Sequence, residues 1–154
     1  QFNGSVRTLY STAHAIGQAV ADADLVIGAV LVPASAAPKL VTRSMVRSMR
    51  AGSVVVDIAI DQGGCCETSR PTTHAAPTFV EHGVVHYCVT NMPGAVPRTS
   101  AFALNNATLP YVRALADKGR ERATREDPAL AAGVNVAGGR IVHPAGARDL
   151  GIVA

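Results

Sequence analysis

Apolar residues gather in three long runs in the first part of the chain, and each run is bounded by polar residues, glycine or proline. The runs are residues 23–32 (ADLVIGAVLV), 53–60 (SVVVDIAI) and 84–91 (VVHYCVTN). Their β-branched, nearly unbroken apolar character is typical of parallel strands that helices cover on both faces. Residues 6–10 (VRTLY) predict a further short strand before them.

Helical spacing of apolar residues fills two of the gaps between these strands. Ser11 and Thr12 are candidate N-caps for the first helix, and Thr42 is the candidate N-cap for the second. Each helix is short and has one apolar face. The positions expected to face the core are Ala13, Ile16, Gly17, Val20, Met45, Val46 and Met49.

The resulting order is strand, helix, strand, helix, strand, strand, with short connections. Such alternation predicts an α/β fold with a parallel sheet and right-handed crossovers. The number of strands corresponds to half of a doubly wound domain.

The last third of the chain has a different pattern. Residues 97–118 predict a long helix, which Pro110 is expected to kink or split and Gly119 to close. A short helix follows at residues 128–132, and residues 138–144 (GGRIVHP) predict an isolated strand.

The segment at residues 57–64 (DIAIDQGG) carries the strongest chemical signal. Asp61 is the first charge to emerge after a buried strand, and Gly63 and Gly64 let the backbone turn sharply beside it. Because ligands of open parallel sheets bind at the carboxyl ends of the strands, Asp61 is a candidate site residue. A capping or turn role for Asp61 stays open, and Asp57, inside the strand, is expected to be paired and structural.

Composition narrows the possible classes of protein. The 154 residues carry a net charge of +3 spread along the chain, which does not favour a nucleic-acid partner. No apolar stretch reaches the roughly 20 residues of a membrane span, and no signal peptide is visible. We therefore expect a cytoplasmic protein without a membrane partner. The start at Gln1 leads us to expect a fragment.

Cysteine and histidine spacing does not predict a metal site. The three cysteines are an odd number without a disulfide framework, so free thiols are expected. No zinc-ligand spacing is formed, and His86 and Cys88 share one face of a strand, where a core-facing or interface position is expected. The segment of residues 133–140 has glycines at P-loop spacing but lacks the lysine and the hydroxyl residue of a P-loop. It is therefore expected to be a turn.

Several ungapped blocks, taken together, resemble the alanine dehydrogenase family, which also includes NAD(P) transhydrogenases. They are residues 9–34, 54–65, 69–75, 88–100 and 103–112. The resemblance implies NAD as the cofactor and reversible oxidative deamination of L-alanine to pyruvate and ammonia. The fold it implies is the second half of a Rossmann-type domain, followed by a long helix and part of the substrate domain.

The resemblance also implies a division of the chain at residue 96. Residues 1–96 would form the C-terminal half of the NAD-binding domain, and residues 97–154 the connecting helix and part of the substrate domain. No GxGxxG occurs in the chain, so the pyrophosphate turn would lie upstream, and this stretch alone is expected to be inactive. The full-length protein is expected to be a homo-oligomer, namely a hexamer.

Residue roles carried over from the family centre on Asp61, whose position corresponds to a catalytic carboxylate beside the nicotinamide and the substrate amino group. Residues 33–38 (PASAAP) depart from the family pattern, so contacts from that loop are open. Ala114 and Lys118 replace a metal-binding Glu and His of some relatives, and no metal is expected. The implied cofactor-binding residues are Ser11, Val30, Leu31, Ile58, Ala59, Ile60, Asp61, Arg70, Val89, Thr90, Asn91 and Met92.

Two alternative functions stay open from the sequence. One is the NAD-binding component of a proton-translocating transhydrogenase, which shares the strand ending in QGG but carries a longer acid in the corresponding stretch. The other is a non-catalytic oligomerisation module built on the long helix.

Overall fold

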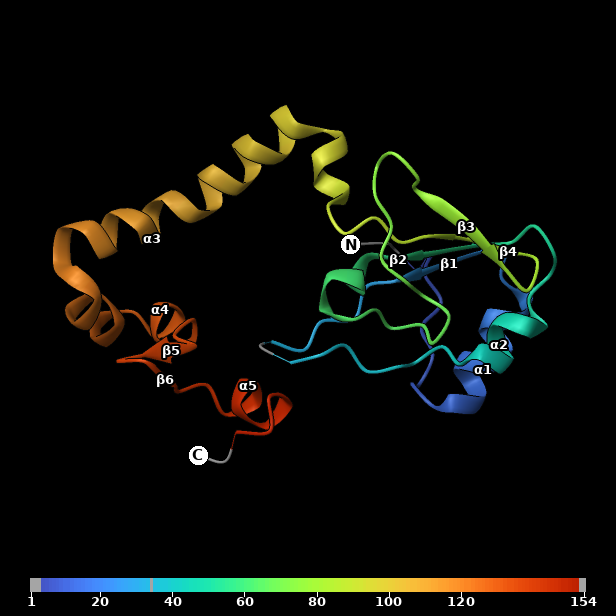
Figure 1. Cartoon of the computed structure of the whole chain (residues 1–154), viewed down its shortest axis with the longest axis horizontal. Helices are drawn as coiled ribbons and strands as arrows, with labels where there is room; N and C mark the ends of the chain where they lie inside the picture. Colours follow the sequence, from blue (N-terminus) through green and yellow to red (C-terminus); the bar gives the residue numbers. More distant parts are fainter. Residues whose placement is uncertain (1–3, 34, 153–154) are drawn as a thin grey trace. The chain divides into compact units, whose positions relative to one another are not determined.

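The chain forms two compact units in a computed structural model that describes residues 4–33 and 35–152 (Figure 1). Gln1–Val32 and Ala36–Asn91 make up the first unit, and Pro33–Ser35 with Met92–Ala154 make up the second. The first unit contains a sheet and the second is largely helical. Within the described ranges, no helix combines the length and apolar character that a membrane crossing requires.

The first unit alternates helices and strands, as the hydrophobic pattern predicts. Its described elements are α1 (Ala13–Asp22), β1 (Leu25–Gly28), α2 (Arg43–Ser48), β2 (Val54–Asp57), a 3₁₀ helix η1 (Ile58–Gln62), β3 (Thr78–Glu81) and β4 (Val84–Tyr87). The sheet has the order β1-β2-β4-β3, in which β1, β2 and β4 are parallel and β3 is antiparallel to β4. The predicted α/β fold with a parallel sheet is therefore confirmed, with one antiparallel edge strand added.

Both predicted helices of this unit begin at a threonine cap. The Thr12 hydroxyl accepts a hydrogen bond from the amide of Ala15 at 3.1 Å, and the Thr42 hydroxyl accepts one from the amide of Met45 at 3.3 Å. Each bond satisfies an amide that has no partner within the first helical turn. Of the two candidate caps of α1, Thr12 therefore fills the role, and Ser11 is exposed.

The strands are shorter than their apolar runs. Residues 6–10 form no strand and are exposed, because β1 is the edge of the sheet and no described segment pairs along its outer side. The run at residues 23–32 is a strand only over β1. The run at 53–60 turns into η1 after Asp57, and the run at 84–91 leaves the sheet after Tyr87, although Val89 forms an isolated bridge with Thr72.

The hairpin between β3 and β4 is not predicted by the hydrophobic pattern, which indicates no strand at residues 78–81. His82 and Gly83 connect the strands with φ angles of 54° and 80°, the positive values of a two-residue hairpin turn. The pair His-Gly between two short apolar runs was the available signal, but histidine is a less common residue at such a position than asparagine or aspartate.

One face of the sheet packs against α1 and α2, and the other face is partly open. Val26, Val55 and Val84 belong to the helix-covered core. On the opposite face Leu25 is 53% and Ile27 is 57% exposed. Helices are expected on both faces of the sheet, but among the described residues of this unit they cover one face. The core cluster consists of Val20, Ala37, Val41, Val46, Met49, Val55, Ala59, Cys65, Cys66 and Val84.

The second unit is built mainly from helices that begin with proline. Its described elements are a 3₁₀ helix η2 (Met92–Ala95), α3 (Pro97–Glu126), α4 (Pro128–Ala132), β5 (Val136–Ala137), β6 (Arg140–Ile141) and α5 (Pro144–Asp149). Proline suits the first helical turn because its missing N–H would have no partner there.

The predictions for the second unit hold in outline. The backbone leaves helical geometry at Gly119 (φ 72°, ψ 161°), where the long helix is expected to close, and a second helical stretch continues to Glu126 within α3. Pro110 lies inside the helix and does not split it. The short helix at residues 128–132 is confirmed as α4. The expected isolated strand is one arm of a hairpin, β5 paired with β6, because Gly138 and Gly139 turn the chain with positive φ.

Candidate functional site

Three parallel strands end at one edge of the sheet in the first unit. β1, β2 and β4 run in the same direction, so the segments after Gly28, Asp57 and Tyr87 emerge at their common carboxyl edge. Most of the implied cofactor residues belong to these segments: Val30 and Leu31 follow β1, Ile58, Ala59, Ile60 and Asp61 follow β2, and Val89, Thr90 and Asn91 follow β4. The topology therefore gathers residues that lie far apart in the sequence.

Asp61 lies on η1, directly after β2, and is exposed. Among the described residues, no group donates a hydrogen bond to its carboxylate. Ile58 is 49% exposed, whereas Ala59 and Ile60 are buried and anchor the 3₁₀ helix to the core. The carboxylate is thus held at the carboxyl edge and is available to a ligand.

Asp57 is buried and paired, as its position inside an apolar strand predicts. Its Oδ2 accepts hydrogen bonds from the amides of Cys65 at 2.9 Å and Cys66 at 3.1 Å. A Cβ at Gly64 would lie 2.8 Å from the same oxygen, and Gly64 has a φ of +76°. Asp57 therefore holds the loop that follows Asp61, and glycine is required for the loop to approach it.

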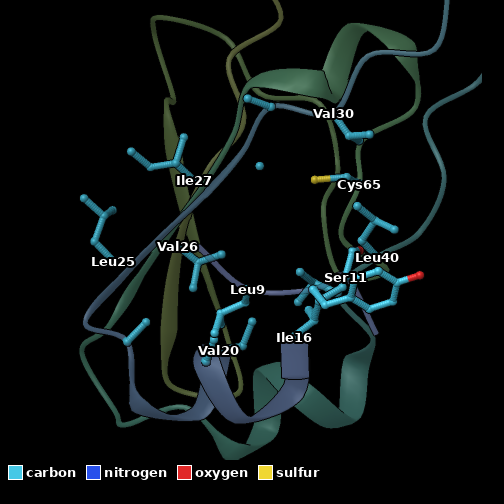
Figure 2. Close-up of a pocket in the computed structure, with 16 residues that line it drawn as sticks. Leu9, Ser11, Ile16, Val20, Leu25, Val26, Ile27, Val30, Leu40 and Cys65 are labelled. Atoms are coloured by element: carbon cyan, nitrogen blue, oxygen red, sulfur yellow. The ribbon is translucent and has the colours of Figure 1, made fainter. Parts of the chain in front are cut away.

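An open apolar pocket of about 450 Å³ borders β1 (Figure 2). Its walls come from the segment before α1, from α1 itself, from β1 and from the residues after β1, and Cys65 points into it. Ser11 and Val30 are the two implied cofactor residues in its wall, and Leu31 is exposed outside it. The pocket joins the carboxyl end of β1 to the start of α1, where ligands of α/β sheets bind.

Arg70 is held over an aromatic ring. Its guanidinium carbon lies 4.0 Å from the ring centroid of Phe79, which stacks on His86 with centroids 4.9 Å apart.

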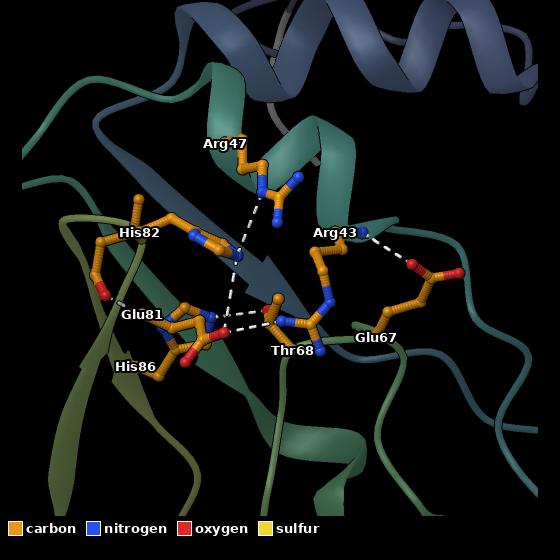
Figure 3. Close-up of polar contacts among 8 residues, drawn as sticks. Arg43, Arg47, Glu67, Thr68, Glu81, His82 and His86 are labelled. Carbon is orange, nitrogen blue, oxygen red and sulfur yellow. Dashed lines mark hydrogen bonds and ion pairs between the residues drawn. The ribbon is translucent and has the colours of Figure 1, made fainter.

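Burial lowers the pKa of His86, so this imidazole is neutral. Its Nδ1–H donates to the carbonyl of Val84 at 3.0 Å, which leaves Nε2 to accept from Thr68 at 2.8 Å (Figure 3).

A second polar cluster ties α2 to the β3–β4 hairpin (Figure 3). Arg43 pairs with Glu81 at 2.6 Å, and Arg47 donates to His82 at 3.4 Å. The backbone amide of Arg43 also donates to Glu67 at 2.7 Å. The hairpin turn precedes β4, so this cluster lies toward the amino edge of the sheet, away from Asp61, and serves to anchor α2.

The last implied cofactor residues follow β4. Val89 is buried, while Thr90 and Asn91 are exposed. The carbonyl of Asn91 accepts a hydrogen bond from His74 at 2.7 Å, which fixes the end of this segment. Met92 begins η2 and belongs to the second unit.

The cysteines are free, as expected, and all three are buried. The Cys66 thiol interacts with Cys65, which lowers the pKa of Cys65 and strongly raises that of Cys66, and burial raises the pKa of Cys88. In the described part of the chain, Asp57, Cys65 and Cys66 form the one group with metal-ligand spacing. Because Asp57 already accepts two backbone amides, this group is a loop anchor, and the absence of a metal stays a prediction.

Lys39 is a residue of this region that sequence reasoning missed. Its Nζ donates to the carbonyls of Gly63 at 2.5 Å and Gly64 at 2.8 Å, directly behind Asp61. A single lysine in an apolar, proline-containing stretch carries no motif, and its partners are 24 and 25 positions away in the sequence. Local patterns could not find it.

Comparison with known proteins gives a consistent result across most of the chain. Residues 1–144 match the family model "Alanine dehydrogenase/PNT, C-terminal domain". The alanine dehydrogenase of Halomonas elongata is 59% identical over 152 residues, and that of Mycobacterium tuberculosis is 55% identical over 152 residues. In both cases the alignment covers 99% of this chain and 41% of the relative.

Solved structures agree with the sequence comparison. An L-alanine dehydrogenase superimposes with a TM-score of 0.77 at 56% identity, covering 97% of this chain and 41% of that chain. A transhydrogenase from Sinorhizobium meliloti is more distant, with a TM-score of 0.62 at 28% identity over 87% of this chain and 36% of that chain. The chain thus spans about two fifths of the length of the relatives it matches.

Proposed function

The chain belongs to the alanine dehydrogenase/PNT family, in the region of its C-terminal domain, and from this membership we propose that the protein is an NAD-dependent alanine dehydrogenase. The proposed reaction is the reversible oxidative deamination of L-alanine to pyruvate and ammonia. The observation that carries the proposal is the exposed Asp61 at the carboxyl edge of the sheet, within a chain that is more than half identical to alanine dehydrogenases.

The residues at this edge fit a dinucleotide. The pocket beside β1 is mostly apolar, as small-molecule sites commonly are, and Ser11 offers a hydroxyl just before α1. The exposed backbone after β4 and the Gly63–Gly64 turn permit close approach to the main chain. When bound, NAD supplies the acceptor for the hydride that leaves the alanine Cα. Ser11, Val30, Leu31, Arg70, residues 58–61 and residues 89–92 are the proposed contacts.

Asp61 is the proposed catalytic group of this chain. Deamination passes through a cationic iminium of the substrate, which water then attacks. A carboxylate beside the substrate nitrogen stabilises that cation and accepts a proton from the attacking water. Because no described residue occupies the Asp61 oxygens, they are available for both roles.

The two units support a proposed division of labour. We assign residues 1–96 to the nucleotide-binding domain and residues 97–154 to a connecting helix and part of a substrate domain. The exposed apolar side chains of α3, among them Phe102 (62% exposed) and Leu104 (65%), support assembly as a homo-oligomer, for which we propose a hexamer. L-alanine and pyruvate are the proposed small-molecule partners, and the cytoplasm is the proposed compartment.

The test of the function is alanine-dependent NADH formation by the protein that carries this chain. Asp61→Asn should lower kcat by about 100-fold or more, the usual contribution of a general acid–base group. Asp22→Asn is the matched control, because Asp22 is an exposed aspartate at the end of α1, toward the amino edge of the sheet. The control should keep full activity.

Two results would refute the proposal. One is an Asp61→Asn variant that retains wild-type kcat with alanine. The other is a protein that transfers hydride between nicotinamide nucleotides but forms no NADH from alanine, which would identify a transhydrogenase component instead.

A further inference from the structure

The loop of residues 62–66, which follows Asp61, turns all five of its carbonyl groups toward the segment of residues 37–41. The main chain of that segment donates to two of these carbonyls. The bonds run from Ala37 to Gln62 at 2.8 Å, from Leu40 to Cys65 at 2.9 Å and from Val41 to Cys65 at 3.1 Å.

The Lys39 side chain reaches the remaining three carbonyls, of which that of Cys66 also accepts from the amide of Ser69 at 3.3 Å. Its Nζ lies 2.5 Å from the oxygen of Gly63, 2.8 Å from that of Gly64 and 3.5 Å from that of Cys66. An ammonium group has three N–H donors and no acceptor, so this arrangement uses its full donor capacity. No carboxylate of the described residues lies within ion-pair distance of Lys39, and the three carbonyls are its partners.

The opposite side of the loop is held by a group of opposite charge. The Asp57 carboxylate accepts the amides of Cys65 and Cys66, so the loop lies between an ammonium on its carbonyls and a carboxylate on its amides. Charge-assisted hydrogen bonds of this kind are stronger than those between neutral groups. Lys39 and Asp57 together form a clamp on residues 62–66.

Asp61 lies directly before this clamp in the chain. Asp61 belongs to η1, a five-residue 3₁₀ helix without a side-chain cap, and such helices have weak hydrogen bonds. After it the chain passes through Gly63 and Gly64, which have no Cβ and adopt positive φ angles, so their backbone is free to move unless other groups restrain it.

We propose that Lys39 is a positioning residue, which holds residues 62–66 and through them sets the place of the Asp61 carboxylate at the carboxyl edge of the sheet. The proposal rests on the proposed function for its consequence in catalysis, because Asp61 is the group that meets the substrate. A misplacement of about 1 Å at a reacting group lowers rates by up to about 100-fold.

The experiment compares Lys39→Met, Lys39→Arg and Arg50→Met in the protein that carries this chain. Met keeps the length of the side chain without donors, whereas Arg keeps the charge and the donors. Arg50→Met is the matched control, since Arg50 is an exposed cation that pairs with Asp24 before β1, at the amino edge of the sheet. The readouts are amide hydrogen exchange and steady-state kinetics with alanine and NAD.

Lys39→Met should speed amide exchange at Gly64 and Cys65 by about tenfold or more, because local opening governs exchange, and leave the amide of Val85 in the sheet unchanged. Its kcat with alanine should fall by about tenfold or more with little change in the KM for NAD. Lys39→Arg should keep most of the wild-type protection from exchange in the loop and most of the wild-type kcat. Arg50→Met should resemble the wild type.

Three results would overturn the positioning role: unchanged exchange in the loop, exchange that rises equally throughout the sheet, or Lys39→Arg behaving like Lys39→Met. If the loop responds as expected while the wild-type protein forms no NADH from alanine, the clamp on residues 62–66 is supported and the proposed function fails. The two ideas can therefore be separated.

Discussion

The two units of this chain are stabilised in different ways. The first unit has a core of ten buried residues beneath α1 and α2, and buried polar groups such as Asp57 bind its loops. In the described part of the second unit, only Ala123 and Ala147 are buried apolar residues. Large side chains of α3, such as Phe102 and Val112, are more than half exposed. Tertiary packing therefore stabilises the first unit, whereas interactions within the helices stabilise most of the second.

The largest loss of stability is expected when the buried carboxyl group of the first unit is removed. Asp57→Ala should lower the free energy of unfolding by about 3 kcal/mol, because two buried amides lose their acceptor. Asp57→Asn keeps an acceptor oxygen and should cost much less. Chemical denaturation followed by circular dichroism measures both. Equal losses for the two variants would show that hydrogen bonding to the loop is not the cause.

Two glycine substitutions, one in each unit, compare the cost of crowding a packed core with the cost of backbone strain. In the first unit, a Cβ at Gly28 would overlap Cys65 Sγ, so Gly28→Ala should cost about 2 kcal/mol through overpacking. In the second unit, nothing lies within 4 Å of a Cβ at Gly119, and Gly119→Ala should cost about 1 kcal/mol through backbone strain at φ +72°.

Hydrogen exchange in each unit separates the two mechanisms. Gly28→Ala should reduce protection in β1 and β2, whereas Gly119→Ala should act within α3. The double variant Gly28→Ala with Cys65→Ala should recover part of the Gly28 loss, because the sulfur is removed. A lack of any recovery would contradict the packing explanation.

The smallest effect is expected at the surface ion pairs of α3. Lys118 and Arg122 hydrogen-bond to Glu126 and lower its pKa from 4.5 to about 2. A carboxyl whose pKa is lower in the folded state stabilises the fold above its ordinary pKa. This contribution is therefore present at neutral pH and is lost as the pH falls from 4.5 toward 2.

The corresponding measurement is an NMR titration of the Glu126 carboxyl group, with helix content of α3 followed over the same range. Glu126→Gln should make the helix content of α3 independent of pH in this range and hold it at the level that the wild type reaches in acid. The difference from the wild type at neutral pH should be small, because exposed ion pairs are screened by water. An ordinary Glu126 pKa would show that the ion pairs do not form in solution.

Sequence reasoning succeeded where structure depends on neighbouring residues. The caps at Thr12 and Thr42, the short helix α4 and the order of alternating elements all follow from patterns within a few positions. It overextended each of the three strands that it predicted in the sheet, since an apolar run shows which residues can be buried but not where pairing stops. It also missed β3, whose existence depends on pairing with β4.

The candidate site shows the same division. Asp61 was recognised from its place after an apolar run, and the structure puts it on an exposed turn at the carboxyl edge. The first helical stretch of α3 ends at Gly119, as expected, because the backbone adopts a positive φ there that glycine permits, whereas Pro110 does not split the helix.

By itself, the sequence determined the α/β class, the starts of the helices and the carboxylate that follows β2, because these depend on side-chain chemistry within a few residues. Only the tertiary structure decided that one face of the sheet is open, that His82 and Gly83 form a hairpin, and that Lys39 holds the loop behind Asp61. The sheet and the contacts of Lys39 join residues that are distant in the sequence. Strand order and register bring them together, and no local pattern encodes either.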